Sequence, residues 1–276
     1  KNIPNIIDYR DLWSQNPRAP YPKLARYLVR HTLEKYVNKR ATVITTVSEG
    51  CAKSILEVQS TARVEILLNT PDKFYKEIYS KPTLCTRPTE FDQNKLNIVL
   101  AGSVYRECTC RPLVQAIKLM PKEWRCQVRL HYYGSTSKIV EHDFRNQGVL
   151  DNLIDHGFVN KLEAINAVKK ADILLSLVFG KSKAKQAAVY GTMTTKVFDY
   201  FLSGKPIINI GPPSADLNLF AQKIGYTEFY SFESSEADKL AEFLLNALRD
   251  LADFRKRNVQ VELPDYAHVA DAPHPS

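Results

Sequence analysis

Short runs rich in β-branched residues alternate with helical stretches along almost the whole chain, and this alternation restricts the fold more than any other feature. The apolar runs at 42–47, 64–68, 97–101 and 173–178 are typical of strands in a parallel sheet. The runs at 42–47, 97–101 and 173–178 are each followed by a segment with helical spacing of its apolar residues. No repeat of solenoid length is present. We therefore expect an α/β fold built from βα units on parallel sheets.

The distribution of the expected strands divides the chain into two Rossmann-like domains. Residues 95–256 carry about six strands with helices between them, the content of a complete doubly wound domain. Residues 1–78 carry only about three, which predicts a partial N-terminal domain corresponding to the later half of a similar one. Residues 79–94 contain Pro82 and Pro88 and lose periodicity, so we expect a linker there. Residues 257–276 are expected to form a tail.

Composition excludes several classes of protein and narrows the partners. The 276 residues are 44% apolar and 25% charged, which excludes a disordered or collagen-like chain. Lys and Arg exceed Asp and Glu by 38 to 30, a net charge of +8. This excess favours an anionic partner, which could be a phosphorylated small molecule, a nucleic acid or an acidic membrane surface. The lysines are dispersed and the aromatic residues follow no RNA-recognition consensus, so we expect no nucleic-acid partner.

Cysteine usage and hydropathy indicate a reducing compartment. The five cysteines are odd in number and sparse, which argues against a disulfide framework. Cys108 and Cys110 are too close together for a usual zinc pair, and we expect no metal. No apolar run is long enough to span a bilayer, and the start does not resemble a signal peptide. These features predict a cytoplasmic protein.

Cations follow the end of one expected strand in the second domain. The strand at 97–101 closes on Gly102 and Ser103, and Arg106 and Arg111 follow shortly after. Ligands of open parallel sheets bind outside the carboxyl ends of the strands, where strand order reverses. These two arginines are therefore candidates for binding a phosphate.

A second anion site is predicted where a helix begins after the strand at 173–178. Free backbone N–H groups there, together with Thr194, Thr195 and Lys196, would bind a phosphate, although a threonine could simply cap the helix. Asp199 and Tyr200 follow Lys196 at helical spacing, on one expected face. A carboxylate one turn into such a helix can accept hydrogen bonds from a ribose; the alternative is a surface Lys196–Asp199 pair of little energetic value.

The sequence around this helix resembles a known family. Residues 194–208 read TTKVFDYFLSGKPII, which is similar to the donor-site helix of GT-B glycosyltransferases of family 4. That family typically has Lys, two apolar residues, an acidic residue and Tyr, then Gly-Lys-Pro. Further segments resemble family segments in the same order along the chain. They are 6–13, 43–49, 69–72, 99–103, and 156–159 followed by the helix and strand at 162–174.

The resemblance implies a role for each candidate residue. Ser103, Arg106 and Arg111 would bind the diphosphate, and Met193, Thr194, Thr195 and Lys196 would bind the distal phosphate at the helix N-terminus. Asp199 would bind the ribose, and Phe158 and Val159 would flank the base through their backbone groups. Gly191 stands where the family commonly has a glutamate that contacts the donor sugar, so the sugar is not predicted. The early strands and glycine-rich loop of the family's N-terminal domain have no counterpart here, and we therefore expect a fragment or a processed form.

The implied activity is transfer of a sugar from a nucleotide diphosphate to an acceptor hydroxyl, with retention of configuration, in polysaccharide or glycolipid synthesis. Cations and helix N–H groups would stabilise the leaving diphosphate without a metal or other cofactor. No catalytic base or nucleophile is predicted. Two alternatives stay open: a non-catalytic nucleotide-binding protein of the same fold, and a GT-B-type sugar-nucleotide epimerase with His156 in its cleft, although His156 as a structural residue is the simpler interpretation.

The acceptor would be a carbohydrate or a lipid-linked molecule. The basic helical stretch at about 23–39 could rest on an anionic membrane, which would suit a lipid-linked acceptor and place the protein at the inner face of the membrane. The alternative is an ordinary solvated basic face.

Overall fold

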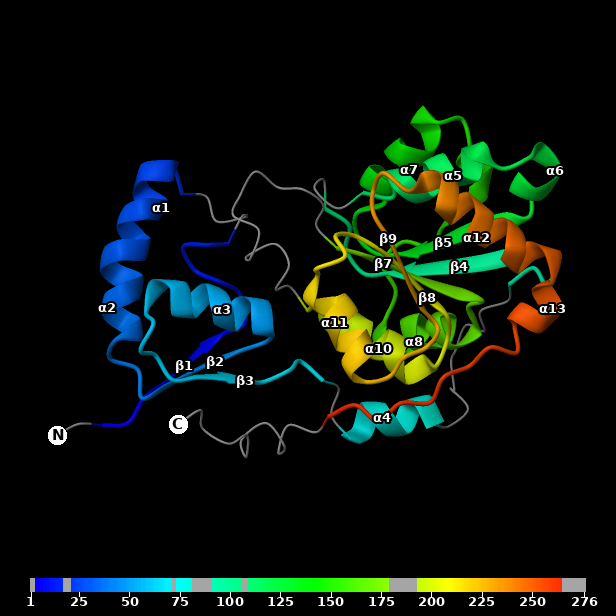
Figure 1. The fold of residues 1–276 in the computed structure, drawn as a ribbon. Coiled ribbons are helices and arrows are strands. Elements are labelled where there is room, and N and C mark those ends of the chain that lie inside the picture. The colour runs from blue at the N-terminus through cyan, green and yellow to red at the C-terminus, as the bar shows by residue number, and fades with distance from the viewer. Residues whose placement is uncertain are drawn as a thin grey trace.

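The structure, a computed structural model, describes residues 3–16, 21–70, 73–80, 91–105, 109–178 and 193–264. Two parallel sheets flanked by helices form the molecule (Figure 1). The predicted Arg106, Gly191 and most of the predicted linker lie outside these ranges.

The smaller sheet has three parallel strands in the order β1-β2-β3, which are β1 (Ile6–Tyr9), β2 (Val43–Thr46) and β3 (Val64–Ile66). A helical rod connects β1 to β2 and consists of α1 (Lys23–Val29), a π-helical turn η1 (Arg30–Glu34) and α2 (Lys35–Asn38). Helix α3 (Glu49–Val58) follows β2, and the Ser48 hydroxyl caps it by accepting a hydrogen bond from the Cys51 N–H. The predicted strands and helices of this segment are confirmed. Its core forms around Tyr9, Ile44 and Ile55.

The larger sheet has six parallel strands in the order β6-β5-β4-β7-β8-β9. They are β4 (Leu96–Ala101), β5 (Val128–Tyr133), β6 (Leu153–Asp155), β7 (Ile173–Leu177), β8 (Ile207–Ile210) and β9 (Phe229–Phe232). The helices that follow are α5 (Arg111–Leu119), α6 (Lys122–Arg125), α7 (Ser137–Asn146), the 3-10 turn η2 (Leu150–Asn152), α8 (Lys161–Lys170), α10 (Thr195–Ser203), α11 (Asp216–Lys223), α12 (Ala237–Arg249) and α13 (Leu251–Phe254). This is the doubly wound order predicted for the second domain.

Two apolar layers cover the two faces of this sheet. Helices α5, α7 and α12 cover one face, while α8, α10 and α11 cover the other. All six residues of β4 are buried, because a central strand of a doubly wound sheet is covered on both sides.

One helix ends earlier than the sequence indicates. The apolar spacing predicts a single helix over about 236–255, but the chain leaves helical geometry at Asp250, with φ −134° and ψ 64°. The Asp250 carboxylate then accepts a hydrogen bond from the Asp253 N–H and starts α13. Asp competes for local backbone hydrogen bonds in this way, which favours a cap over a helix interior.

Two segments pack against the α10 side of the larger sheet. Helix α4 (Lys73–Ser80) follows the smaller sheet but packs against α10, and Lys169 Nζ donates to the Ile78 carbonyl at 3.3 Å. The chain after α13 lies against the same side, where the Val259 N–H donates to the Gly204 carbonyl at 2.9 Å. Gly204 ends α10 with φ +71°, and a Cβ there would be 2.2 Å from Asn258 Oδ1, so only glycine fits. The predicted domain boundary at residue 78 stays a prediction.

Candidate nucleotide-binding site

The candidate site lies at the point where the strand order of the larger sheet reverses. Strand β4 pairs with β5 on one side and with β7 on the other, so the connections leave β4 and β7 toward opposite edges. The carboxyl ends of two such strands form the crevice in which ligands of open α/β sheets bind. Gly102 and Ser103 follow β4, and the chain after β7 leads to α10.

Backbone hydrogen bonds fix the turns at this edge. The Gly102 N–H donates to the Tyr133 carbonyl at 2.7 Å, and the Gly134 N–H donates to the Gly157 carbonyl at 2.8 Å. A Cβ on Gly134 would lie 2.6 Å from the Gly102 carbonyl oxygen, so glycine is required for the two turns to approach so closely. The ends of β4, β5 and β6 are therefore held together as one rigid rim.

The start of α10 is positioned against β4 by two side chains. The Tyr200 hydroxyl accepts a hydrogen bond from the Ala101 N–H at 3.0 Å. The Lys196 side chain runs along Gly102, where its Nζ would be 3.9 Å from a Cβ placed on that glycine. The Lys196 side chain and the Gly102 turn thus lie side by side, and the assignment of Ser103 and Lys196 to the donor phosphates stays a prediction.

The first turn of α10 presents a positive helix end toward this turn. Thr194 is the N-cap residue, but its hydroxyl accepts no hydrogen bond from the helix, and the first turn contains no acidic residue. The alternative of a capping threonine is therefore confirmed in the position of Thr194 but not in a side-chain cap. Thr194 and Thr195 are exposed, so the backbone N–H groups and hydroxyls of this turn have the arrangement that binds anions at helix N-termini.

Asp199 lies one turn along α10 from Lys196 and is buried. Its carboxylate is 7% exposed and forms an ion pair with Lys161, the first residue of α8. Burial raises the pKa of Asp199, and the Lys161 ammonium opposes this rise. The alternative of a surface Lys196–Asp199 pair is wrong, because Asp199 is buried and pairs with Lys161. Lys196, Asp199 and Tyr200 are three and four residues apart on α10 and so share one side of the helix, as predicted, although this side is buried at Asp199 and Tyr200.

The segment expected to flank the base follows β6. Gly157 has φ +67°, and its N–H donates to Asp155 Oδ1 at 2.9 Å, which turns the chain toward α8. Phe158 is 82% exposed, while Val159 packs against the apolar layer under α8 and α10. Asn160 then caps α8 through its side chain. Phe158 thus lies exposed at the rim of the sheet, and its predicted place beside the base stays a prediction.

The remaining predicted diphosphate residues lie near this rim with different surroundings. Ser103 is exposed immediately after Gly102. Arg111 is the first residue of α5, and its guanidinium lies close enough to Asp143 on α7 to lower the pKa of that carboxyl against the rise that burial causes. Its assignment to the diphosphate, like that of Arg106, stays a prediction.

Sequence reasoning missed two side chains around Asp199. Lys161 pairs with it from α8, and Tyr79 approaches it from α4, where burial and the Asp199 carboxylate raise the pKa of the Tyr79 hydroxyl. The position of Lys161 directly after a capping asparagine predicts only a helix start. Its contact with Asp199 depends on the packing of α8 on α10, which no local pattern encodes.

Behind the rim, a series of hydrogen bonds between buried polar side chains holds the His156 ring in position. The amide nitrogen of Asn97 donates to the carbonyls of Asp92 and Lys95, each at 2.9 Å. Its Oδ1 therefore accepts a hydrogen bond from His131 Nε2 at 3.0 Å. His131 Nδ1 is then the acceptor for His156 Nε2, also at 3.0 Å, and the His156 ring stacks on Tyr133 at 4.2 Å.

These contacts give His156 structural partners, in agreement with its simpler interpretation. His131 is 3% exposed, and burial, followed by the neighbouring His156 and Arg129, lowers its pKa to about 4. His131 is therefore neutral at neutral pH, as the hydrogen-bond chain requires.

The stability of the protein should decrease below pH 6.5 because of His131. The unfolded chain protonates this histidine below its ordinary pKa of 6.5, whereas the folded protein protonates it only near 4. The unfolded state thus binds more protons in this window, and we expect a loss of about 2 kcal/mol at pH 5 relative to pH 8. Urea unfolding across this pH range measures the loss. His131→Gln should remove this part of the pH dependence, whereas His142→Gln, at an exposed position of α7, should retain it.

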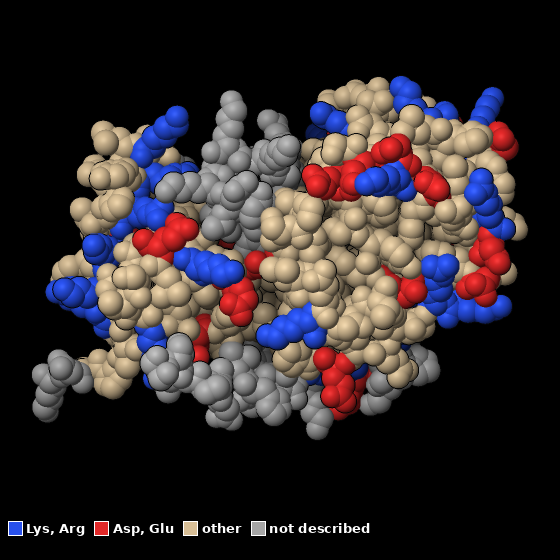
Figure 2. All heavy atoms as spheres, in the orientation of Figure 1, with Lys and Arg blue, Asp and Glu red and all other residues tan. Residues whose placement is uncertain are grey.

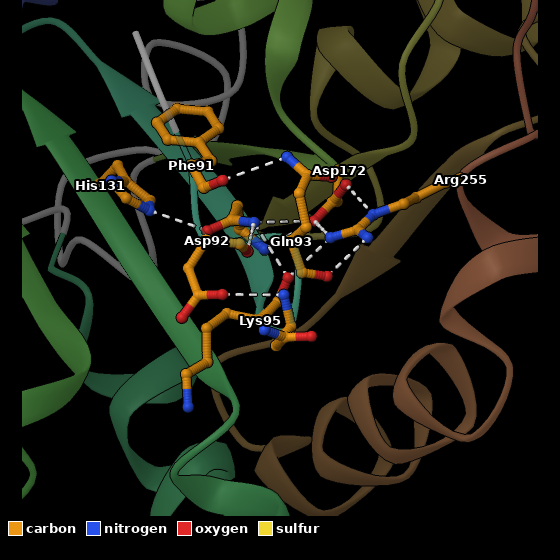
Figure 3. Close-up of polar contacts among 9 residues, drawn as sticks. Phe91, Asp92, Gln93, Lys95, His131, Asp172 and Arg255 are labelled. Carbon is orange, nitrogen blue, oxygen red and sulfur yellow. Dashed lines mark hydrogen bonds and ion pairs between the residues drawn. The ribbon is translucent and has the colours of Figure 1, made fainter.

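At the opposite edge of the sheet, Arg255 forms an ion pair with the buried Asp172 (Figure 3). Its Nε donates to Asp172 Oδ1 at 2.8 Å and its Nη2 to Oδ2 at 3.1 Å. The same guanidinium donates to the carbonyls of Gln93 and Lys95. Asp172 also accepts from the Asn97 N–H at 2.8 Å. This cluster joins the amino ends of β4 and β7 to the chain after α13, away from the candidate site.

Within the part of the chain that the structure describes, no group of three or more His, Cys, Asp or Glu side chains is arranged to hold a metal ion. Among the same residues, no helix is both long and apolar enough to cross a bilayer.

Neither models of protein families nor curated proteins match the chain. Solved structures do. The match to sucrose-phosphate synthase from Thermosynechococcus elongatus includes 91% of this chain and 62% of the synthase chain, with a TM-score of 0.58 and 14% sequence identity. The match to WaaG, a glycosyltransferase involved in lipopolysaccharide biosynthesis, includes 99% of this chain and 72% of WaaG, with a TM-score of 0.57 and 14% sequence identity. The match to a point mutant of S. aureus TarM includes 88% of this chain and 45% of the TarM chain, with a TM-score of 0.55 and 13% sequence identity. That structure was solved in complex with fondaparinux, alpha-GlcNAc-glycerol and UDP.

The chain therefore spans between 45% and 72% of the length of these three proteins. At such identities the likeness shows the fold alone. It confirms the predicted α/β fold of GT-B type with parallel sheets.

Proposed function

We propose that the chain is the nucleotide-sugar-binding part of a retaining glycosyltransferase similar to family 4, which transfers a sugar from a nucleoside diphosphate to an acceptor hydroxyl. The observation that carries the proposal is the meeting of Lys196 and the start of α10 with the Gly102 turn at the reversal of strand order. A cation and the positive end of a helix at that point suit a diphosphate. The resemblance of residues 194–208 to the family 4 donor helix and the shared GT-B fold support the same function.

The described residues suggest how such a donor would be held. The diphosphate would lie on the first turn of α10, with Lys196, Thr194, Thr195 and Ser103 around it, and Arg106 and Arg111 would add positive charge from the loop after β4. These fixed dipoles and charges would stabilise the negative charge that develops on the leaving diphosphate. The chemistry proposed here uses no metal or other cofactor. No catalytic base is assigned.

The nucleoside would extend from the diphosphate toward β6. Its ribose would hydrogen-bond to Asp199, which would then share its carboxylate between the sugar hydroxyls and Lys161, and its base would lie by Phe158 and Val159. The TarM structure contains UDP, which makes uridine diphosphate the first ligand to test. The acceptor would be a carbohydrate or lipid-linked hydroxyl in polysaccharide or glycolipid synthesis, and the site of reaction the cytoplasm.

Asp199→Asn is expected to weaken binding of UDP by roughly tenfold, about 1.4 kcal/mol. The amide keeps the shape of the carboxylate but replaces one acceptor by a donor. The melting temperature should change little, because the side chain of Lys161 is 48% exposed and stays solvated without its partner. Titration calorimetry with UDP and with its 2′,3′-dideoxy analogue measures the effect.

The analogue serves as the control, because it lacks the hydroxyls that would need the carboxylate, so it should lose much less affinity. Asp151→Asn, at an exposed position before β6, should change neither titration. Equal losses for both ligands would show that Asp199 acts through the loop structure and not through the ribose.

A further inference from the structure

Tyr79 carries a buried hydroxyl that forms no hydrogen bond with any residue that the structure describes. The residue belongs to α4, and its ring packs against the apolar layer that contains α8 and α10. Figure 1 shows α4 alongside α10, on the outer side of this layer. Tyr79 as a whole is half-buried, whereas its hydroxyl is fully buried. The hydroxyl is therefore directed into the protein and not toward solvent.

This arrangement is unusual for a tyrosine, whose hydroxyl normally finds a partner when it is buried. Two other buried tyrosines of the same layer follow the rule. The Tyr200 hydroxyl accepts a hydrogen bond from the Ala101 N–H at 3.0 Å, and the Tyr226 hydroxyl donates to the Lys205 carbonyl at 2.8 Å. A buried hydroxyl without a partner lowers stability, and phenylalanine would place the same ring at position 79 without this cost. The Tyr79 hydroxyl thus requires a reason other than stability.

The polar group that interacts with this hydroxyl is the Asp199 carboxylate. Burial and then the Asp199 carboxylate raise the pKa of the Tyr79 hydroxyl, although the two groups do not have the geometry of a hydrogen bond. Lys161, the first residue of α8, forms an ion pair with the same carboxylate. Side chains from α4, α8 and α10 therefore meet at Asp199, and one donor among them is unused.

The capacity of the carboxylate leaves room for that donor. A carboxylate can accept about four hydrogen bonds. In the proposed site, one would come from Lys161 and two from the ribose hydroxyls, which leaves one for Tyr79. The last torsion of an aspartate side chain is soft, so the carboxylate plane can rotate unless several donors hold it. A further donor from α4 would fix the plane in which Asp199 meets the ribose.

We propose that Tyr79 is a positioning residue of the nucleotide site, whose hydroxyl donates to Asp199 when a ribonucleotide binds and so orients the carboxylate toward the ribose. The inference rests on the proposed function, because it needs a ribose at Asp199. It adds a residue from outside the larger sheet, since α4 lies between β3 and β4 along the chain. A bound nucleotide would thus also hold α4 against α10.

The groups around Asp199 determine how ribose binding depends on pH. Among the described residues they are Lys161 of α8, Tyr79 of α4 and the neighbouring Tyr200 of α10. Burial raises the pKa of Asp199, and Lys161 and then Tyr79 oppose this rise. On the face that Figure 2 shows, acidic and basic side chains are interspersed over the larger sheet and its helices. Such mixed surface charges are screened by salt, so the local contacts decide the ionisation of Asp199.

Tyr79→Phe should weaken the binding of UDP by roughly fivefold, about 1 kcal/mol, and leave the binding of its 2′,3′-dideoxy analogue nearly unchanged. The melting temperature should stay the same or rise, because phenylalanine keeps the ring and removes the unbonded hydroxyl. The variant should also lose affinity for UDP at a higher pH than the original chain on acidification, since the carboxylate has one donor fewer and its pKa increases. Titration calorimetry from about pH 8 to pH 5 measures both effects, and the titration of UDP itself is the same for the two proteins.

Tyr226→Phe is the matched control, because it removes a buried hydroxyl that has a partner in the Lys205 carbonyl. It should lower the melting temperature and change neither titration. In a chain that already carries Asp199→Asn, Tyr79→Phe should have little further effect on UDP binding, because the hydroxyl acts through the carboxylate.

UDP binding that Asp199→Asn weakens and Tyr79→Phe leaves unchanged would overturn the inference and leave the proposed function intact. Equal losses for UDP and the dideoxy analogue in Tyr79→Phe would also overturn it, since the residue would then act on the structure of the site in general. A chain that binds none of UDP, GDP and ADP would contradict the proposed function, and the role of Tyr79 with it.

Discussion

Lys196→Met should weaken the binding of UDP by about tenfold to a hundredfold and the binding of uridine far less. The Lys196 side chain lies along Gly102 at the start of α10, where the proposed diphosphate would meet both the turn and the helix. A charge-assisted hydrogen bond contributes roughly 1.5–3 kcal/mol, and each decade of affinity corresponds to about 1.4 kcal/mol. Methionine keeps the length and apolar contacts of the stem and removes the charge.

Titration calorimetry with the two ligands separates a phosphate contact from a general effect on the site. The control is Lys118→Met, which removes an exposed cation of α5 whose ammonium bonds Gln147. That variant should bind both ligands normally, although it changes the net charge equally. If Lys196→Met weakened uridine and UDP to the same extent, the diphosphate assignment would be wrong. Removing the charge of Arg106 should have the same selective effect as Lys196→Met.

Asp172→Asn should lower the free energy of unfolding by about 3 kcal/mol. Asp172 is 8% exposed, and its carboxylate receives two bonds from Arg255 and one from the Asn97 N–H. The asparagine amide would direct its own N–H groups at one of these donors and leave the guanidinium without a counter-charge. Removing one partner of a buried pair typically costs about 3–5 kcal/mol, and the partial exposure of Arg255 places this case at the lower end.

The midpoint of urea unfolding, at unchanged slope, measures this loss. Asp253→Asn is the matched control, because its ion pair with Lys256 is exposed on both sides; it should cost less than about 1 kcal/mol. Asp172→Asn/Arg255→Met should be less destabilised than the sum of the two single variants, since neither charge then stays behind alone. Additive losses would show that the pair makes no cooperative contribution.

The sequence by itself determined the class of fold and predicted the place of the candidate site. Alternating β-branched runs and helical stretches predicted parallel sheets, because strand and helix periods are local properties of the chain. The same pattern located α10, and its resemblance to a family placed Lys196 and Asp199 on it. The sequence did not locate the break at Asp250, because the apolar spacing continues through it and only the competing cap interrupts the helix.

Only the tertiary structure decided what these residues contact. The Lys196 side chain lies along Gly102 and the Asp199 carboxylate pairs with Lys161, and both contacts depend on how α10 packs on β4 and α8. The order of the six strands, which creates the crevice, likewise depends on pairing between segments far apart in the chain. On the rod, the sequence shows leucines, tyrosines and lysines, but whether they face the core or solvent depends on the rotation that the π-helical turn and the contacts of Glu34 and Asn38 impose. Periodicity records which residues share a side, whereas burial of that side requires partners that the local sequence does not contain.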